Sequence, residues 1–146
     1  MSLSILMAAL SIQATPAPAR SGLDVEIPAV QGVVVDPTCG GRPAMTTLAT
    51  CFATTQAGVA ALADTWNAAF AQQGWIAADG DDNRVVYVRR RPEGGCDGFQ
   101  LVAFDDGRQV AAPAAPAYIA LATIPGDVCA AQPAAPTPPA TPTTPQ

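Results

Sequence analysis

The sequence predicts an α+β fold, a two-layer sandwich in which one amphipathic helix packs on a mainly antiparallel sheet of four or five strands (β-α-β-β-β-β). One segment in the middle of the chain repeats its apolar residues with a helical period. The segments around it are rich in β-branched and aromatic residues and are separated by Gly- and Asp-containing turns. We expect a single small domain over residues 20–130, held together by disulfides.

The first 19 residues have the pattern of a signal peptide. An apolar run over residues 3–12 (LSILMAALSI) is too short to span a bilayer and is typical of a signal-peptide core. Small residues follow, so cleavage is expected after Ala14 or after Ala19. No basic residue precedes the apolar run, which departs from the usual pattern. The sequence therefore predicts a periplasmic or secreted protein with no transmembrane anchor.

The elements before the helix are the least distinct. Residues 25–35 are apolar enough for one short strand. Residues 45–52 (MTTLATCF) favour a strand through their Thr and apolar content, but Met45, Leu48 and Phe52 also extend the apolar stripe of the helix that follows. A long helix over residues 45–73 is therefore the alternative.

The helix itself is predicted over residues 56–73. Its apolar residues, spaced three and four apart, are Val59, Leu62, Trp66 and Phe70. Thr54 or Thr55 provides an N-cap, and Gly74 is suited to end the helix. Both tryptophans, Trp66 and Trp75, are expected in the core.

Four strands are predicted after the helix. Residues 75–78 and 84–90 flank Asp79-Gly80-Asp81-Asp82-Asn83, which predicts a β-hairpin. Residues 99–104 and 117–124 read as two further strands, joined by an Ala/Pro-rich loop. Residues 131–146 contain Ala, Pro, Thr and Gln without charge or large apolar side chains, so this tail is predicted to be disordered and proline-rich.

Composition excludes several classes of function. The chain contains no His and no Lys, and every Ser lies within the first 21 residues. Catalytic triads, lysine Schiff bases and His-ligated metals are therefore excluded from the folded region. A net charge of −5 without a long block of either sign argues against nucleic-acid binding. No cofactor is expected.

The four cysteines predict two disulfides. If the strands at 98–105 and 117–124 pair antiparallel, Cys96 and Cys129 lie side by side, which leaves Cys39 to pair with Cys51. The chain-entropy model gives each bond about 3 to 4 kcal/mol of stabilisation. A four-thiolate zinc site is the rival interpretation, but the spacings lack two close Cys pairs.

Two polar clusters are candidate binding sites. Asp79, Asp81 and Asn83 have the spacing that opens a calcium-binding loop, but the positions that would need Gly and Glu hold Arg, which favours a plain hairpin tip. The second cluster, Arg89 to Arg91, could bind phosphates or carboxylates, with Arg89 and Arg91 on one face of the strand and Arg90 on the other. Its plainer interpretation is a solubilising strand end.

These observations predict an exported, non-catalytic interaction module whose partner is an anionic envelope polymer or a protein. One alternative is a hydrolase that uses only carboxylates and acts on an envelope glycan. The other is an inhibitor of a partner enzyme, with the disulfide-rigid loop 107–116 as its contact surface.

Overall fold

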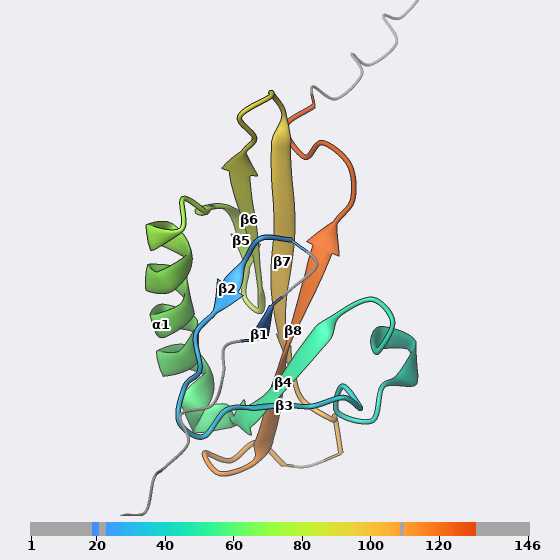
Figure 1. Cartoon of the computed structure of the whole chain (residues 1–146). Coiled ribbons are helices and arrows are strands. Elements are labelled where there is room, and N and C mark those ends of the chain that lie inside the picture. The colour runs from blue at the N-terminus through green and yellow to red at the C-terminus, as the bar shows by residue number, and fades with distance from the viewer. Residues whose placement is uncertain (1–18, 21–22, 109, 131–146) are drawn as a thin grey trace, which may run out of the picture.

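A computed structural model describes residues 19–20, 23–108 and 110–130, and in it one helix packs on an antiparallel sheet (Figure 1). The helix is α1 (Val59–Gln72). The sheet has six strands, one more than the upper expectation, in the spatial order β3 (Val34–Val35), β4 (Thr50–Thr55), β8 (Pro116–Ile124), β7 (Cys96–Phe104), β6 (Arg84–Arg90), β5 (Ile76–Asp81). The predicted α+β class is confirmed.

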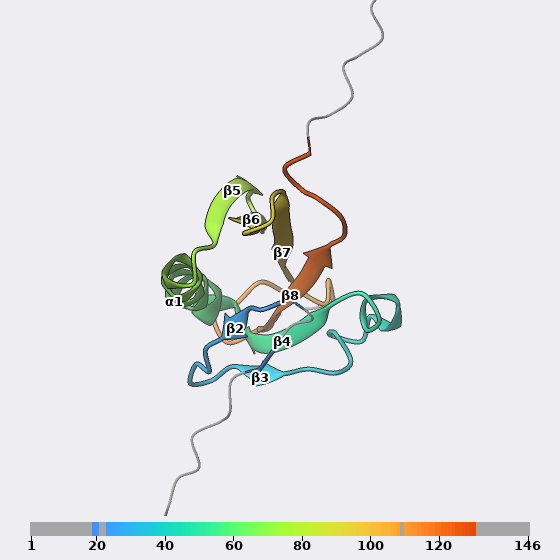
Figure 2. The ribbon, with the colours of Figure 1, turned by 45° about the horizontal axis from the view of Figure 1, so that its top comes forward.

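A small second sheet lies on the side of the main sheet that α1 covers. It consists of β1 (Ala19–Arg20) and β2 (Glu26–Ile27), paired antiparallel with Ala19 opposite Ile27. In Figure 2, β2 lies between α1 and β4. Val25 and Ile27 are almost fully buried in the main core, so this ribbon closes one side of it.

The core lies between α1 and the sheet. Leu62, Trp66 and Phe70 of α1 are buried, as their spacing predicts. Phe70 packs edge to face against Phe99 of β7 with ring centroids 5.1 Å apart, and Trp66 packs in the same way against Phe52 of β4 at 4.9 Å. Such edge-to-face contacts are a preferred geometry for buried aromatic rings.

The ends of the helix follow from local chemistry. Residues Gln56–Gly58 form a 3-10 turn, so α1 begins three residues later than predicted. The Thr55 side chain caps this turn by accepting a hydrogen bond from the Gly58 N–H at 3.2 Å. Gly74 has a φ of +84°, the left-handed conformation that ends a helix at little cost only for glycine.

The segment before β4 corrects one prediction. The strand expected over residues 45–52 begins only at Thr50, and a 3-10 turn (Pro43–Met45) precedes it. The alternative, a helix over residues 45–73, is wrong. Met45 packs with the Cys39–Cys51 cluster, whereas Phe52 belongs to the main core, so their helical spacing does not reflect a shared face.

The single strand expected over residues 25–35 is also wrong, because the segment forms two short strands, β2 and β3. Residues 28–33 separate them and include a turn in which the Val33 N–H donates to the Val30 carbonyl. The Pro28 carbonyl accepts a hydrogen bond from Trp66 Nε1 at 3.1 Å, which fixes this crossing to the helix.

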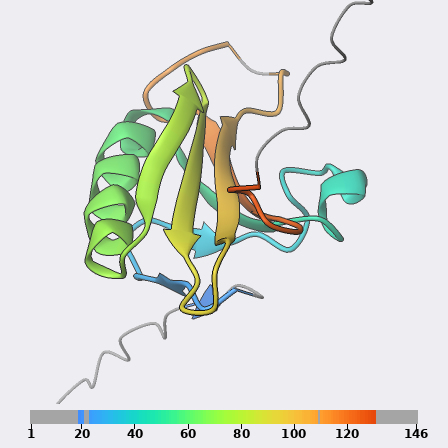
Figure 3. The same cartoon turned by 90° about the horizontal axis from the view of Figure 1, so that it is seen from above.

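The remaining strands lie close to their predicted positions, but β5 extends through Asp81 into the predicted turn and β7 begins at Cys96, three residues earlier than predicted. β5 and β6 form the expected hairpin beside β7 (Figure 3). β7 pairs antiparallel with β8 in a register that places Gly98 opposite Ile124. Within the described residues, no helix is long and apolar enough to cross a membrane. The predicted tail at 131–146, and all of the predicted signal peptide except Ala19, lie outside the described residues.

Candidate functional site

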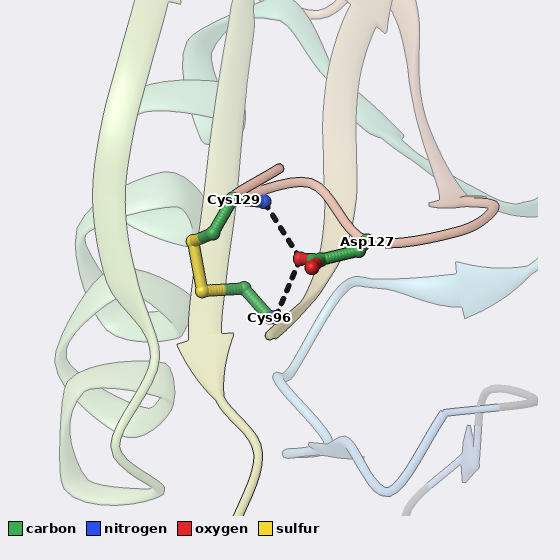
Figure 4. A group of neighbouring side chains, drawn as sticks. All are labelled: Cys96, Asp127 and Cys129. Atoms are coloured by element: carbon green, nitrogen blue, oxygen red, sulfur yellow. Dashed lines mark hydrogen bonds between the residues drawn. A yellow bond between two sulfur atoms is a disulfide. The ribbon is translucent and has the colours of Figure 1, made fainter. Parts of the chain in front are cut away.

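Two regions bring polar or reactive side chains together. The first is the C-terminal staple, which we define as Arg91, Cys96, Asp127 and Cys129 (Figure 4 shows the last three). The second is the hairpin pocket, an apolar hollow between α1 and the tip of the β5–β6 hairpin. The staple includes two predicted disulfide cysteines and one arginine of the predicted anion-binding cluster.

The disulfide of the staple joins the start of β7 to the segment after β8. Cys96 and Cys129 are bonded, with their Cα atoms 5.3 Å apart, as the pairing of the two strands suggests. The Asp127 carboxylate accepts hydrogen bonds from the backbone N–H groups of Cys96 at 2.8 Å and Cys129 at 3.0 Å (Figure 4). These two bonds lower the pKa of Asp127 below its ordinary value.

Arg91 extends the staple on its other side. Its guanidinium donates to the Asp97 carboxylate at 2.7 Å and to the Gly126 carbonyl at 2.8 Å. The hydrogen bond to Asp97 is the main reason that the pKa of Arg91 is raised. Arg91 therefore ties β7 to the chain after β8, alongside the disulfide.

The staple resembles a metal site only in composition. The sulfur atoms of Cys96 and Cys129 and a carboxylate oxygen of Asp127 lie within 4.8 Å of one another. Both sulfurs are bonded to each other, however, and metal binding or nucleophilic attack requires a thiolate. The carboxylate already accepts two N–H groups. The arrangement is that of a structural clamp.

The second disulfide, Cys39–Cys51, links the loop before β4 to β4 itself, with a Cα separation of 5.1 Å. The loop is ordered by Asp36, whose carboxylate accepts hydrogen bonds from the Thr38 hydroxyl at 2.7 Å and the Gly40 N–H at 2.6 Å. The Thr38 bond first, and then the Gly40 bond, lower the pKa of Asp36.

The three arginines of the predicted anion-binding cluster are separated by their contacts. Arg89 lies over the ring of Trp75 at 4.3 Å, and it donates to the Gln73 carbonyl at 3.3 Å. Arg91 belongs to the staple. Arg90 is exposed, with no partner among the described residues. An anion-binding role for the cluster stays a prediction, but two of its guanidiniums already bind groups of the protein itself.

The calcium-like cluster lies at the tip of the β5–β6 hairpin. The Arg84 guanidinium lies 3.0 Å from the Asp81 carboxylate and 3.5 Å from that of Asp79. The Asn83 amide donates to the Ala103 carbonyl at 3.0 Å. The protein's own arginine therefore provides the positive charge for these carboxylates.

The hairpin pocket has a volume of about 130 Å³, and sequence reasoning did not find it. Its floor is formed by buried apolar side chains of the sheet, and Val59 and Ala63 of α1 form one wall. Its rim is the polar hairpin tip, residues 81–84. The floor and the remaining wall comprise Val85, Tyr87, Leu101, Ala103 and Ile119.

Hydrogen bonds hold the rim and the floor of the pocket in place. The Ala103 N–H donates to the Asn83 carbonyl at 2.8 Å, and the Asn83 amide returns a bond to the Ala103 carbonyl, so the hairpin tip is fixed to β7. The Tyr87 hydroxyl donates to the Asn67 side chain of α1 at 3.3 Å. Burial raises the pKa of Tyr87, so the hydroxyl stays neutral.

The small side chains of Ala63 and Ala103 are the signal that sequence reasoning could have used. Both occupy positions that face the core, where a larger apolar residue would fill the space. The periodicity of the helix shows which face of α1 is buried but does not show that the packing is incomplete at Ala63. Comparisons with protein families, with curated proteins and with solved structures find no match to this chain.

Proposed function

We propose that the protein is an exported, non-catalytic binding module. The observation that carries the proposal is the hairpin pocket, an unfilled apolar hollow with a charged rim on a small domain with two disulfides. The hollow is smaller than the pockets of about 300 to 1,000 Å³ that hold whole small molecules, but its apolar lining and polar border are the composition of a binding site.

Export is supported by the disulfides and by the signal-like N-terminus. Disulfides persist in oxidising compartments such as the periplasm and the extracellular space. Of the two cleavage positions, the one after Ala14 leaves β1 whole, whereas cleavage after Ala19 removes one of its two residues. We therefore propose Thr15 as the first residue of the mature protein.

A binding role is favoured over catalysis by the state of the acidic residues. Several carboxylates of the described region already accept backbone hydrogen bonds or pair with arginine: Asp36, Asp79, Asp81, Asp97 and Asp127. A hydrolase that uses only carboxylates needs two unoccupied acids facing one substrate. No observation favours such a pair in the part of the chain that the structure describes.

A protein partner is favoured over an anionic polymer. Arg89 and Arg91 bind groups within the domain, whereas the rim of the hairpin pocket contains Asp81 and Asp82. An anionic polymer would be repelled from that rim.

The inhibitor alternative retains one supporting observation. The end of the loop that joins β7 to β8 is held by hydrogen bonds to Gln56. The side-chain carbonyl of Gln56 accepts a hydrogen bond from the Ala112 N–H at 3.1 Å, and the Gln56 backbone N–H donates to the Ala115 carbonyl at 2.9 Å. The exposed Val110 precedes this anchored stretch. The stiffness comes from Gln56 and not from a disulfide, contrary to the expectation of a disulfide-rigid loop.

The test is a binding experiment with the mature protein. The mature protein is immobilised, and secreted and envelope fractions of its native host are passed over it. The same protein, free in solution, serves as the competitor. The proposal predicts saturable, competed retention of one protein and no consumption of added glycans. Turnover of a glycan that a single Asp or Glu substitution abolishes, or no saturable ligand in any fraction, would contradict it.

A further inference from the structure

We infer that the hairpin pocket receives one apolar side chain of a protein partner, and that a basic side chain beside it on the partner pairs with the acidic rim. This inference rests on the proposed binding function and names the site and the chemistry of the partner. Three features carry it: the size of the hollow, its rigidity and the charge at its border.

The size of the pocket suits a single side chain. An apolar cavity of about 150 Å³ holds one benzene molecule, so a hollow of about 130 Å³ accommodates one branched or aromatic side chain. Leu101, Ile119 and Tyr87 form its base, each at most 6% exposed. An apolar group that enters is therefore surrounded mainly by carbon atoms.

The pocket is formed before any partner arrives. The paired hydrogen bonds between Asn83 and Ala103 fix the rim to β7, and the bond from Tyr87 to Asn67 fixes the floor to α1. A preformed site binds with a smaller loss of conformational entropy than one that must be ordered. The segment that lines one wall is also anchored, since Thr55 caps the turn that leads to Val59.

The border of the pocket is negatively charged. Arg84 pairs with Asp79 and Asp81, and Asp82 has no ion-pair partner among the described residues, so the hairpin tip holds three carboxylates and one guanidinium. A basic group on the partner complements this excess. The net charge of −5 makes two copies of the chain repel each other, which favours a different protein over a second copy.

The probes for the test are three capped tetrapeptides, and the second and third each differ from the first at one position. The first is Gly-Arg-Leu-Gly, the second is Gly-Glu-Leu-Gly and the third is Gly-Arg-Ser-Gly. They are titrated into the isotope-labelled mature protein at low salt and followed by NMR. We expect the Arg-Leu peptide to shift the amide signals of Ala63, Asn83 and Ala103 saturably, the Glu-Leu peptide to bind at least threefold more weakly, and the Arg-Ser peptide not to saturate.

Matched variants locate the binding on the protein. Ala63→Leu fills the pocket from α1 and should weaken the Arg-Leu peptide tenfold or more, whereas Ala68→Leu, the same change at an exposed position of the same helix, should have no effect. Asp82→Asn should weaken binding about two- to fivefold at low salt and not at high salt. Glu93→Gln removes the same charge at the far end of β6 and should not change binding.

The outcomes separate this inference from the proposed function. Equal binding of the three peptides, or unchanged affinity in Ala63→Leu, would overturn the inference; if that variant fails to fold, Ala103→Val fills the pocket from β7 instead. Benzene binding as tightly as the Arg-Leu peptide would indicate a small-molecule site. Broadening of the protein's NMR signals with rising protein concentration, without peptide, would indicate that a second copy occupies the pocket. Either result would overturn the inference. If Ala63→Leu retains the natural partner fully in the capture experiment, the pocket is excluded while the binding function stands.

Discussion

Trp66 and Trp75 are buried to nearly the same degree but differ in their polar contacts. The exposed fraction is 1% for Trp66 and 2% for Trp75. Trp66 donates its indole N–H to the Pro28 carbonyl. The indole N–H of Trp75 has no hydrogen-bond partner among the described residues, although Arg89 lies over its ring and Phe99 packs against it at 4.8 Å.

This difference predicts unequal costs for the same substitution. Trp66→Phe removes a hydrogen bond and leaves the Pro28 carbonyl without its partner, whereas Trp75→Phe removes no hydrogen bond. Both lose similar apolar area, so we expect Trp66→Phe to lower the free energy of unfolding by about 1 kcal/mol more than Trp75→Phe. Urea denaturation of the two variants measures this directly, and an equal or reversed order would contradict the assigned contacts.

The stability that the Asp127 carboxylate gives the C-terminal staple depends on pH. The pKa of its carboxylate is lowered in the folded protein, mainly by the N–H groups of Cys96 and Cys129. A lowered folded-state pKa stabilises the fold above the pKa of the unfolded state, and that stabilisation is lost as the pH falls below about 4.

Asp127→Asn should therefore lower the Tm at neutral pH and reduce the difference in Tm between about pH 5 and pH 2 relative to the wild type. Asp64→Asn, at an exposed position of α1 without a described partner, is the control and should retain the pH dependence of the wild type. Thermal unfolding followed by circular dichroism provides the comparison. A pH dependence in Asp127→Asn as large as that of the wild type would show that the carboxylate does not cap the staple.

Among the elements, α1 and the β5–β6 hairpin were predictable because their signals are local. The periodicity of Leu62, Trp66 and Phe70 identifies the buried face, and the Gly74 position ends the helix. The start of β4 was not predictable in the same way. Met45 continues the helical stripe in sequence, but it packs with the Cys39–Cys51 cluster, and the pairing of the two cysteines does not show where the strand between them begins.

The candidate site was less predictable than the fold. The sequence places Arg89 and Arg91 in one cluster, but their partners, Trp75 and Asp97, lie on segments that strand pairing brings beside the end of β6 from either side. The hairpin pocket arises where α1, β6, β7 and β8 converge, and only the packing shows that Ala63 leaves space there.

Filling the pocket tests whether that space exists. Ala63→Leu should raise the free energy of unfolding by about 0.5 to 1 kcal/mol, because it places carbon atoms in an existing apolar hollow. Ala68→Leu on the exposed face of α1 should change it by less than about 0.5 kcal/mol. Chemical denaturation measures both. A lower free energy of unfolding in Ala63→Leu would show that side chains of α1 and the sheet already fill this space.

The whole molecule depends on its two cross-links. The described domain is small, and the disulfides join the start of β7 to the chain after β8, and β4 to the loop before it. The sequence separations of 33 and 12 residues correspond to about 4 and 3 kcal/mol in the chain-entropy model. Together they are comparable to the total stability of a typical domain, about 5 to 15 kcal/mol.

Replacing the cysteines in pairs tests this dependence. Cys96→Ala with Cys129→Ala, and Cys39→Ala with Cys51→Ala, should each lower the free energy of unfolding by about 3 kcal/mol or more. The variant without any cysteine should be largely unfolded at room temperature. Urea denaturation followed by circular dichroism measures the free energy of unfolding of all three variants. A cysteine-free variant as stable as the wild type would show that the two disulfides are not needed for stability.

The central claim, an exported domain closed by two disulfides, is tested most directly by mass spectrometry of the protein from its native host. Free thiols are alkylated before lysis, and the intact mass and the non-reduced peptides are mapped in each cell fraction. We predict a mature chain beginning at Thr15, found outside the cytoplasm, with Cys39 linked to Cys51 and Cys96 linked to Cys129. A chain that retains its first residues and carries four alkylated cysteines would contradict the account.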